Sequence, residues 1–181
     1  MRVFVAIDLP EELKNKIGQI QQELKACDLD CKWVKPQNIH LTLKFLGEAE
    51  KEEIDEMKQT LKSAAKEFRA FKVSFKEFGF FPQEREPRVL FVSTDNEENL
   101  KNIVSALSPQ ENLPVGRQGK FKSHITLARL KSNKNVDCLK RRIKSIVFTE
   151  SFEVKDITLF KSKLNAQGPI YEKILTSSFT T

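Results

Sequence analysis

The chain is poor in several residue types on which common functions depend. Its 181 residues include three cysteines, two histidines, one tryptophan and one tyrosine. The cysteines, Cys27, Cys31 and Cys138, are odd in number, and their spacing matches no zinc or redox motif. We therefore expect them to be ordinary packing residues of a protein in a reducing compartment.

Long apolar runs are also absent. No stretch approaches the roughly 18 apolar residues that cross a bilayer. The apolar run at the amino terminus meets Asp8 and Glu11 too early for a signal peptide. We expect a soluble, cytoplasmic protein without a membrane partner.

Two common catalytic motifs are missing. The sequence has no GxSxG elbow for a serine nucleophile and no GxxxxGK[ST] loop for a nucleoside triphosphate. A metal site needs about three protein ligands, and neither histidine has a carboxylate or a second histidine at a useful local spacing. We expect no metal and no cofactor.

What the chain does have is a duplicated motif that contains both histidines. HLTL occupies residues 40–43 and HITL occupies residues 124–127. Given the first copy, the same Thr and Leu after the second histidine would arise by chance about once in 200. In a strand, His and Thr face one side and the apolar residues face the other. The pattern predicts two imidazoles and two hydroxyls in one cleft, although a single histidine on such a strand is usually only packed or solvated.

The rest of the chain alternates between strand and helix patterns, and its second half resembles its first. The histidines are 124 − 40 = 84 residues apart, and FKVSF and FEVKD begin 152 − 71 = 81 residues apart. We expect one catalytic domain of two diverged repeats, about 1–85 and 86–181. The expected strands are 2–8, 38–47, 71–81, 88–92, 121–130, 152–160 and 171–175, and the expected helices are 11–26, 51–68, one from about residue 100, and 136–146.

Two facing histidines suit in-line displacement at phosphorus. One neutral imidazole acts as base and one protonated imidazole as acid, because their ordinary pKa lies near 6.5. The hydroxyls of Thr42 and Thr126 are then candidates to bind the non-bridging oxygens. Arg129 is a weaker candidate, since its odd spacing places it on the Leu127 face of a regular strand.

Aromatic and basic residues near the motifs are candidates for contacts with a nucleic acid. Trp33, Phe45 and Phe81 are candidates to stack on a base, although most of the 14 phenylalanines must be core. The net charge of +6 favours an anionic partner, but a lysine-rich surface of the kind found in heat-adapted proteins explains it as well. The basic candidates for RNA contacts are Arg117, Lys120 and Lys122.

The sequence resembles a known family over nearly its whole length. The resemblance rests on RVFVAIDLP at the start, on the segment from Trp33 to Gly47, on Phe81-Pro82 and 87–90, on HITLAR at 124–129, and on Ser162, Leu164, Gly168 and Tyr171. These features are similar to the two-histidine phosphoesterases, specifically the RNA 2',3'-cyclic phosphodiesterases once described as 2'-5' RNA ligases. Many members have Pro before the second histidine, where this chain has Ser123.

The resemblance implies a fold and an activity. The fold is α+β and bilobal, with two pseudo-symmetric repeats of antiparallel sheet and flanking helices around a central cleft, interleaved into two lobes. The activity is metal-free hydrolysis of 2',3'-cyclic phosphate ends of RNA to 2'-phosphomonoesters, with His40 as proton donor and His124 as acceptor. The reverse reaction would join a cyclic phosphate to a 5'-hydroxyl end.

Several points stay open at this stage. We expect a monomer acting on RNA 3' ends, with tRNA halves among the candidate substrates. A phosphodiesterase for a small cyclic nucleotide and a catalytically silent RNA-binding module are the alternatives. A silent module has no need for both histidines and both threonines, whereas the small-nucleotide alternative can be separated only by comparing substrates.

Overall fold

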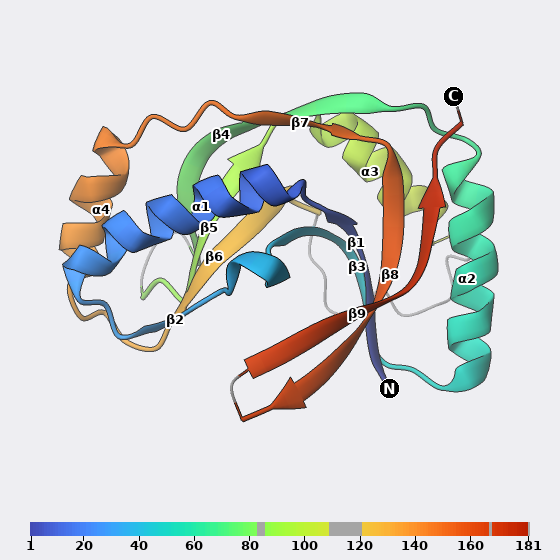
Figure 1. Ribbon diagram of the computed structural model, residues 1–181, viewed down its shortest axis with the longest axis horizontal. Helices are drawn as coiled ribbons and strands as arrows, with labels where there is room; N and C mark the ends of the chain where they lie inside the picture. The colour runs from blue at the N-terminus through green and yellow to red at the C-terminus, as the bar shows by residue number, and fades with distance from the viewer. Residues whose placement is uncertain (83–85, 109–120, 167, 181) are drawn as a thin grey trace.

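One antiparallel β-sheet runs through the protein (Figure 1). The computed structural model describes residues 1–82, 86–108, 121–166 and 168–180, and within them nine strands form this sheet. The strands are β1 (Arg2–Asp8), β2 (Cys31–Trp33), β3 (His40–Glu48), β4 (Phe71–Phe81), β5 (Val89–Thr94), β6 (His124–Leu130), β7 (Ser151–Val154), β8 (Asp156–Asn165) and β9 (Gly168–Ser178).

Four α-helices flank the sheet. They are α1 (Glu11–Leu24), α2 (Lys51–Ala65), α3 (Glu97–Ala106) and α4 (Val136–Ser145), with 3-10 turns η1 (Lys25–Cys27) and η2 (Pro36–Asn38). α4 and α2 stand at opposite ends of the molecule, and α1 crosses in front of β5 and β6 (Figure 1). The expected α+β class, with an antiparallel sheet and flanking helices, is confirmed.

Amphipathic patterns explain the two longest helices. The apolar side chains of α1 recur every three or four residues and are buried, namely Leu13, Ile17, Ile20 and Leu24. In α2, Glu50 and Glu53 form a capping box that satisfies the first backbone amides. None of the described helices is long and apolar enough to cross a membrane.

The strand order is β7-β4-β5-β6-β3-β1-β8-β9, with β2 paired to β6. It is arranged about its centre, where the two motif strands β6 and β3 are neighbours. β4 follows β3 in the chain but pairs with β5, and β8 pairs with β1 from the opposite end of the chain. The division of the sequence into two repeats stays a prediction, but strands from both ends of the chain do share one side of the sheet.

Two expected strand boundaries were wrong. Residues 152–160 form two strands separated at Lys155, because β7 pairs with β4 whereas β8 pairs with β1. The similar segments FKVSF and FEVKD pair with each other, with Val73 opposite Phe152. The first motif strand begins at His40, since Asn38 ends η2.

The expectation for the cysteines was also wrong. Cys27 and Cys138 form a disulfide with their Cα atoms 5.7 Å apart, while Cys31 is free and half-buried. The bond joins the end of η1 to the first turn of α4. The sequence could not reveal this pair because its members lie 111 residues apart and meet only through the fold.

Candidate active site

The two motifs meet at a single rung of the sheet. β3 and β6 pair through Leu41 and Ile125, each the residue between His and Thr in its motif. Both side chains are fully buried, whereas the flanking His and Thr residues are only partly buried. The alternation expected from the sequence is therefore present in both strands.

This rung places the four polar residues on one face. In the antiparallel register set by Leu41 and Ile125, one step either way puts His40 opposite Thr126 and Thr42 opposite His124. Opposite residues share a face, with Cβ atoms about 5 Å apart, and diagonal neighbours lie about 7–8 Å apart. Each imidazole thus has a hydroxyl across from it, and the two imidazoles lie on a diagonal.

Both imidazoles are oriented by the same hydrogen bond. His40 Nδ1 lies 2.7 Å from the carbonyl oxygen of Asn38, and His124 Nδ1 lies 2.7 Å from that of Lys122. A carbonyl only accepts, so each Nδ1 carries a proton and donates it. Each Nε2 is left available as acceptor in the neutral ring and as donor in the protonated one.

Aromatic rings surround each histidine. Phe4 lies 4.9 Å from the His40 ring, and Tyr171 meets it edge-on at 5.3 Å. Phe81 and Phe91 stack on each other at 4.2 Å and both meet His124 edge-on, at 5.1 and 5.6 Å. The two imidazoles therefore occupy similar, largely apolar settings on their respective sides.

The surroundings make both histidines weak bases. Burial lowers the pKa of His40 to about 4, against which the Asn38 carbonyl and the charge of Asp8 act. Burial also lowers the pKa of His124, and the charges of Arg129 and Lys122 add to this lowering. In the free protein both rings are consequently neutral at pH 7.

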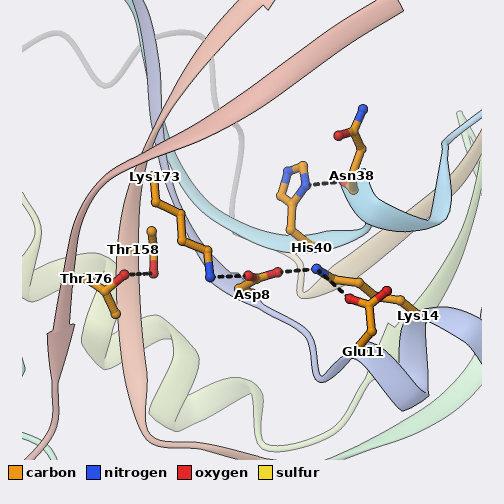
Figure 2. Close-up of polar contacts among 8 residues, drawn as sticks. All are labelled: Asp8, Glu11, Lys14, Asn38, His40, Thr158, Lys173 and Thr176. Carbon is orange, nitrogen blue, oxygen red and sulfur yellow. Dashed lines mark hydrogen bonds and ion pairs between the residues drawn. The ribbon is translucent and has the colours of Figure 1, made fainter.

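A charged cluster beside His40 was not expected from the sequence. Asp8, opposite His40 in the β1–β3 pairing, is bound by Lys14 and Lys173, each at 2.7 Å (Figure 2). Burial alone raises the pKa of Asp8, but the hydrogen bonds and charges of the two lysines outweigh it and the pKa is lowered. The Lys14 side chain is only 8% exposed, so this pair lies mostly out of solvent.

Each motif strand contains a bulge directly after its threonine. β3 has one extra residue, Leu43, relative to β1, and β6 has one extra residue, Leu127, relative to β5. The registers that show this are Val5↔Lys44 followed by Ala6↔Thr42, and Leu90↔Ala128 followed by Phe91↔Thr126. A bulge reverses the alternation of faces beyond it.

The bulges bring two further candidates to the face that holds the histidines. Arg129 is exposed between the buried Ala128 and Leu130, so it does not lie on the Leu127 face as expected for a regular strand. Phe45 occupies the corresponding position of β3, is 55% exposed, and lies 6.0 Å from Phe4. The fifth residue after each histidine is thus an arginine on one side and a phenylalanine on the other.

The other candidates are placed differently. Trp33 is partly buried against the core and pairs with Ala128. Phe81 lies against His124, with the ammonium group of Lys122 5.5 Å from its ring centre. Arg117 and Lys120 lie outside the described residues. Tyr171, which the resemblance included without a role, proves to contact His40.

Donors for a metal do not gather here. Among the described residues, no group of three His, Cys, Asp or Glu side chains is arranged to hold a metal ion. The site consists instead of two imidazoles, two hydroxyls, one guanidinium group and several aromatic rings. This set can transfer protons and bind an anion.

Comparisons with known proteins agree with the geometry. The model of the LigT-like phosphoesterase family matches the chain twice, at residues 7–91 and 92–171. RNA 2',3'-cyclic phosphodiesterases of Methanocaldococcus jannaschii and Archaeoglobus fulgidus are 36% and 34% identical to it, over 96% of this chain and 98% of each relative. The crystal structure of TT0787 of Thermus thermophilus superposes with a TM-score of 0.84 at 28% identity, covering 99% of this chain and 98% of that one. This chain therefore belongs to the LigT-like phosphoesterase family.

Proposed function

We propose that the protein hydrolyses the 2',3'-cyclic phosphate at RNA 3' ends to a 2'-phosphomonoester, with the two histidines as the proton-transfer groups and without a metal ion. The observation that carries the proposal is the pair of imidazoles on adjacent strands, each with Nδ1 bound to a carbonyl and Nε2 available. The names of the relatives support the choice of substrate.

The reaction needs one proton removed and one supplied. Neutral His124 accepts a proton from water through Nε2 while the water oxygen attacks phosphorus. The bond from phosphorus to the 3'-oxygen breaks, and protonated His40 donates its Nε2 proton to that oxygen. The hydroxyls of Thr42 and Thr126 and the guanidinium group of Arg129 stabilise the charge on the non-bridging oxygens.

The unequal residues after the two bulges support this assignment of roles. The departing 3'-oxygen belongs to the ribose that carries the base, so the base lies on the side of the proton donor. Phe45 is on the His40 side and offers an exposed ring for stacking, whereas Arg129 is on the His124 side and offers positive charge. A base on Phe45 therefore favours His40 as donor and leaves His124 to activate water.

Substrate binding also provides the proton that His40 needs. In the free protein the pKa of His40 is about 4, so the ring is neutral near pH 7. An anionic phosphate placed between the two rings raises the pKa of both, since an opposite charge favours the protonated form. One proton shared by the pair is then enough for catalysis.

Replacing the bridging 3'-oxygen of the substrate by sulfur tests the assignment. Sulfur leaves with little need for a proton, so this substrate should restore much of the rate to His40→Ala and little to His124→Ala. With the normal substrate, either replacement should reduce the rate about 10²- to 10⁴-fold. Rescue of His124→Ala instead would reverse the roles, and rescue of neither would mean that the histidines mainly bind phosphate.

Two further measurements separate the alternatives. Activity on a short oligonucleotide with a 2',3'-cyclic end should exceed activity on cyclic mononucleotides, and the opposite ranking would favour a small-nucleotide substrate. EDTA should leave the rate unchanged, whereas loss of activity that a divalent ion restores would overturn the metal-free mechanism. Joining of a cyclic phosphate to a 5'-hydroxyl end is expected as the reverse reaction when an RNA hydroxyl replaces water.

A further inference from the structure

The carbonyl group that orients each histidine lies outside the β-ladder. Asn38 ends η2 and Lys122 precedes β6, which begins at His124. Strand pairing therefore does not fix the direction of either carbonyl directly. Each needs another contact if the imidazole bound to it is to keep one orientation.

On the His40 side, the contact comes from the Asn38 side chain. Its amide nitrogen Nδ2 donates to the carbonyl oxygen of Pro169 at 2.7 Å, across 131 residues of sequence. Asn38 is only 8% exposed, and its side chain points away from the imidazole that its backbone carbonyl binds (Figure 2). This bond ties the residue before β3 to the first residues of β9.

On the His124 side, a different pair of residues makes the contact. The hydroxyl of Ser123 is hydrogen-bonded to the hydroxyl of Thr94, at the end of β5. Ser123 is 2% exposed and Thr94 is 6% exposed, so the bond is buried. Since Ser123 lies between Lys122 and His124, this bond fixes the peptide that carries the orienting carbonyl.

The two sides reach the same geometry with unrelated residues. The Nδ1 to carbonyl distance is 2.7 Å in both, but one side uses an amide and the other two hydroxyls. The position before His40, which corresponds to Ser123, is held by the buried apolar Ile39. Burial of polar groups is costly unless they are bonded, so the repeated outcome points to a requirement of the two histidines and not to an inherited pattern.

We propose that Asn38 and the Ser123–Thr94 pair are positioning residues, which hold the carbonyls of residues 38 and 122 so that each histidine keeps its proton on Nδ1 and presents Nε2 to the substrate. The catalytic consequence rests on the proposed function. The orientation and tautomer of the rings do not, and they can be measured in the resting protein.

The expected direction of the pH effect follows from the carbonyl bonds. Each bond raises the pKa of its histidine against the larger effect of burial, so weakening it lowers the pKa further. The other charged groups that act on the rings are Asp8, Lys14 and the opposite histidine for His40, and Arg129 and Lys122 for His124. A variant at residue 38 should therefore move the limb of the pH–rate profile that belongs to His40, and a variant at residue 94 the limb that belongs to His124.

The test is ¹⁵N NMR of the imidazole rings, because two histidines give two separate sets of signals. In Asn38→Ala, the His40 ring should lose its dominant Nδ1–H tautomer while His124 keeps it. In Thr94→Val, which is similar in shape but lacks the hydroxyl, the result should be the reverse. Each variant should lower kcat roughly 10- to 100-fold, with KM changed much less, because misplaced groups mainly affect the chemical step.

Matched controls separate positioning from general stability. Thr158→Val removes the hydroxyl of another buried inter-strand pair, Thr158 with Thr176 at 2.9 Å (Figure 2). Asn135→Gly removes a hydrogen bond from the side-chain amide to the Asp28 carbonyl while tolerating the backbone φ of 58°. Neither should change the tautomers, and Thr94→Ser should restore the His124 ring.

The outcomes are distinct. Unchanged tautomers in folded Asn38→Ala and Thr94→Val would overturn the proposal. If Thr94→Val fails to fold, Ser123→Ala breaks the same bond from the other side and decides the question. Altered tautomers together with a native protein that does not cleave cyclic phosphates would reject the proposed function but support the positioning role.

Discussion

The low pKa of His40 makes the stability of the protein depend on acid in a way that one substitution removes. At pH 7 the ring is neutral in both the folded and the unfolded chain. As pH falls through 6.5 the unfolded chain binds a proton, but the folded chain does not until about pH 4. The folded state is therefore destabilised progressively between these values, and the contribution is fully present only above pH 6.5.

The size of the effect follows from the gap. At pH 4.5 the difference from the unfolded value is 6.5 − 4.5 = 2 pH units, which corresponds to about 2.7 kcal/mol at 1.36 kcal/mol per unit. A domain of ordinary stability, roughly 5–15 kcal/mol, would show this loss clearly. Other groups that titrate in this range are common to the native protein and a variant, so they cancel in a comparison.

Urea unfolding of the native protein and of His40→Asn at about pH 7 and about pH 4.5 provides the measurement. Asparagine cannot be protonated, and its amide can replace Nδ1 as donor to the Asn38 carbonyl. The native protein should lose about 2–3 kcal/mol more than the variant between the two pH values. Equal losses, or an NMR titration of His40 centred near 6.5, would refute the argument.

Three other substitutions test features of the site and its frame. Gly79→Ala places a Cβ within 2.5 Å of the Phe91 ring, so it should lower the unfolding free energy by about 1–3 kcal/mol and reduce activity; an unchanged melting temperature would contradict this contact. Arg129→Ala should reduce kcat/KM about 10- to 100-fold, the loss of a charged hydrogen bond, whereas the exposed Lys131→Ala should have little effect, and equal effects would argue against a phosphate contact. Cys138→Ala should lower the unfolding free energy by about 2–5 kcal/mol, and a melting temperature insensitive to both this change and dithiothreitol would show that the disulfide is dispensable.

Periodicity was sufficient to predict the elements that carry the site. The alternation in both motifs and the spacing of Leu13, Ile17 and Ile20 placed strands and helices correctly, because one face of each element must be buried. The prediction for Arg129 was wrong because it assumed a regular strand. The bulge at Leu127 has no glycine or other local signature, and it becomes visible only when the register with β5 is known.

Contacts between distant residues were beyond the reach of local patterns. Asn38 and Pro169, Thr94 and Ser123, and the two disulfide cysteines are brought together only by the order of strands and helices. Of these residues, Ser123 alone was marked in advance, as a departure from the proline of similar sequences. Its hydroxyl bond to Thr94 anchors the chain where a proline ring would have restricted it.

The pairing of β1 with β8 has a consequence for how the chain is made on the ribosome. Val3 to Ala6 leave the ribosome first, but their partners on one side, Thr158 to Lys161, are among the last residues to be synthesised. At about 5–20 residues per second, β1 must wait for many seconds with an apolar edge unpaired, and such an edge invites pairing with other chains. Slow synthesis or a truncated message should therefore favour aggregation, and a chaperone that covers the first strand should improve the yield of soluble protein.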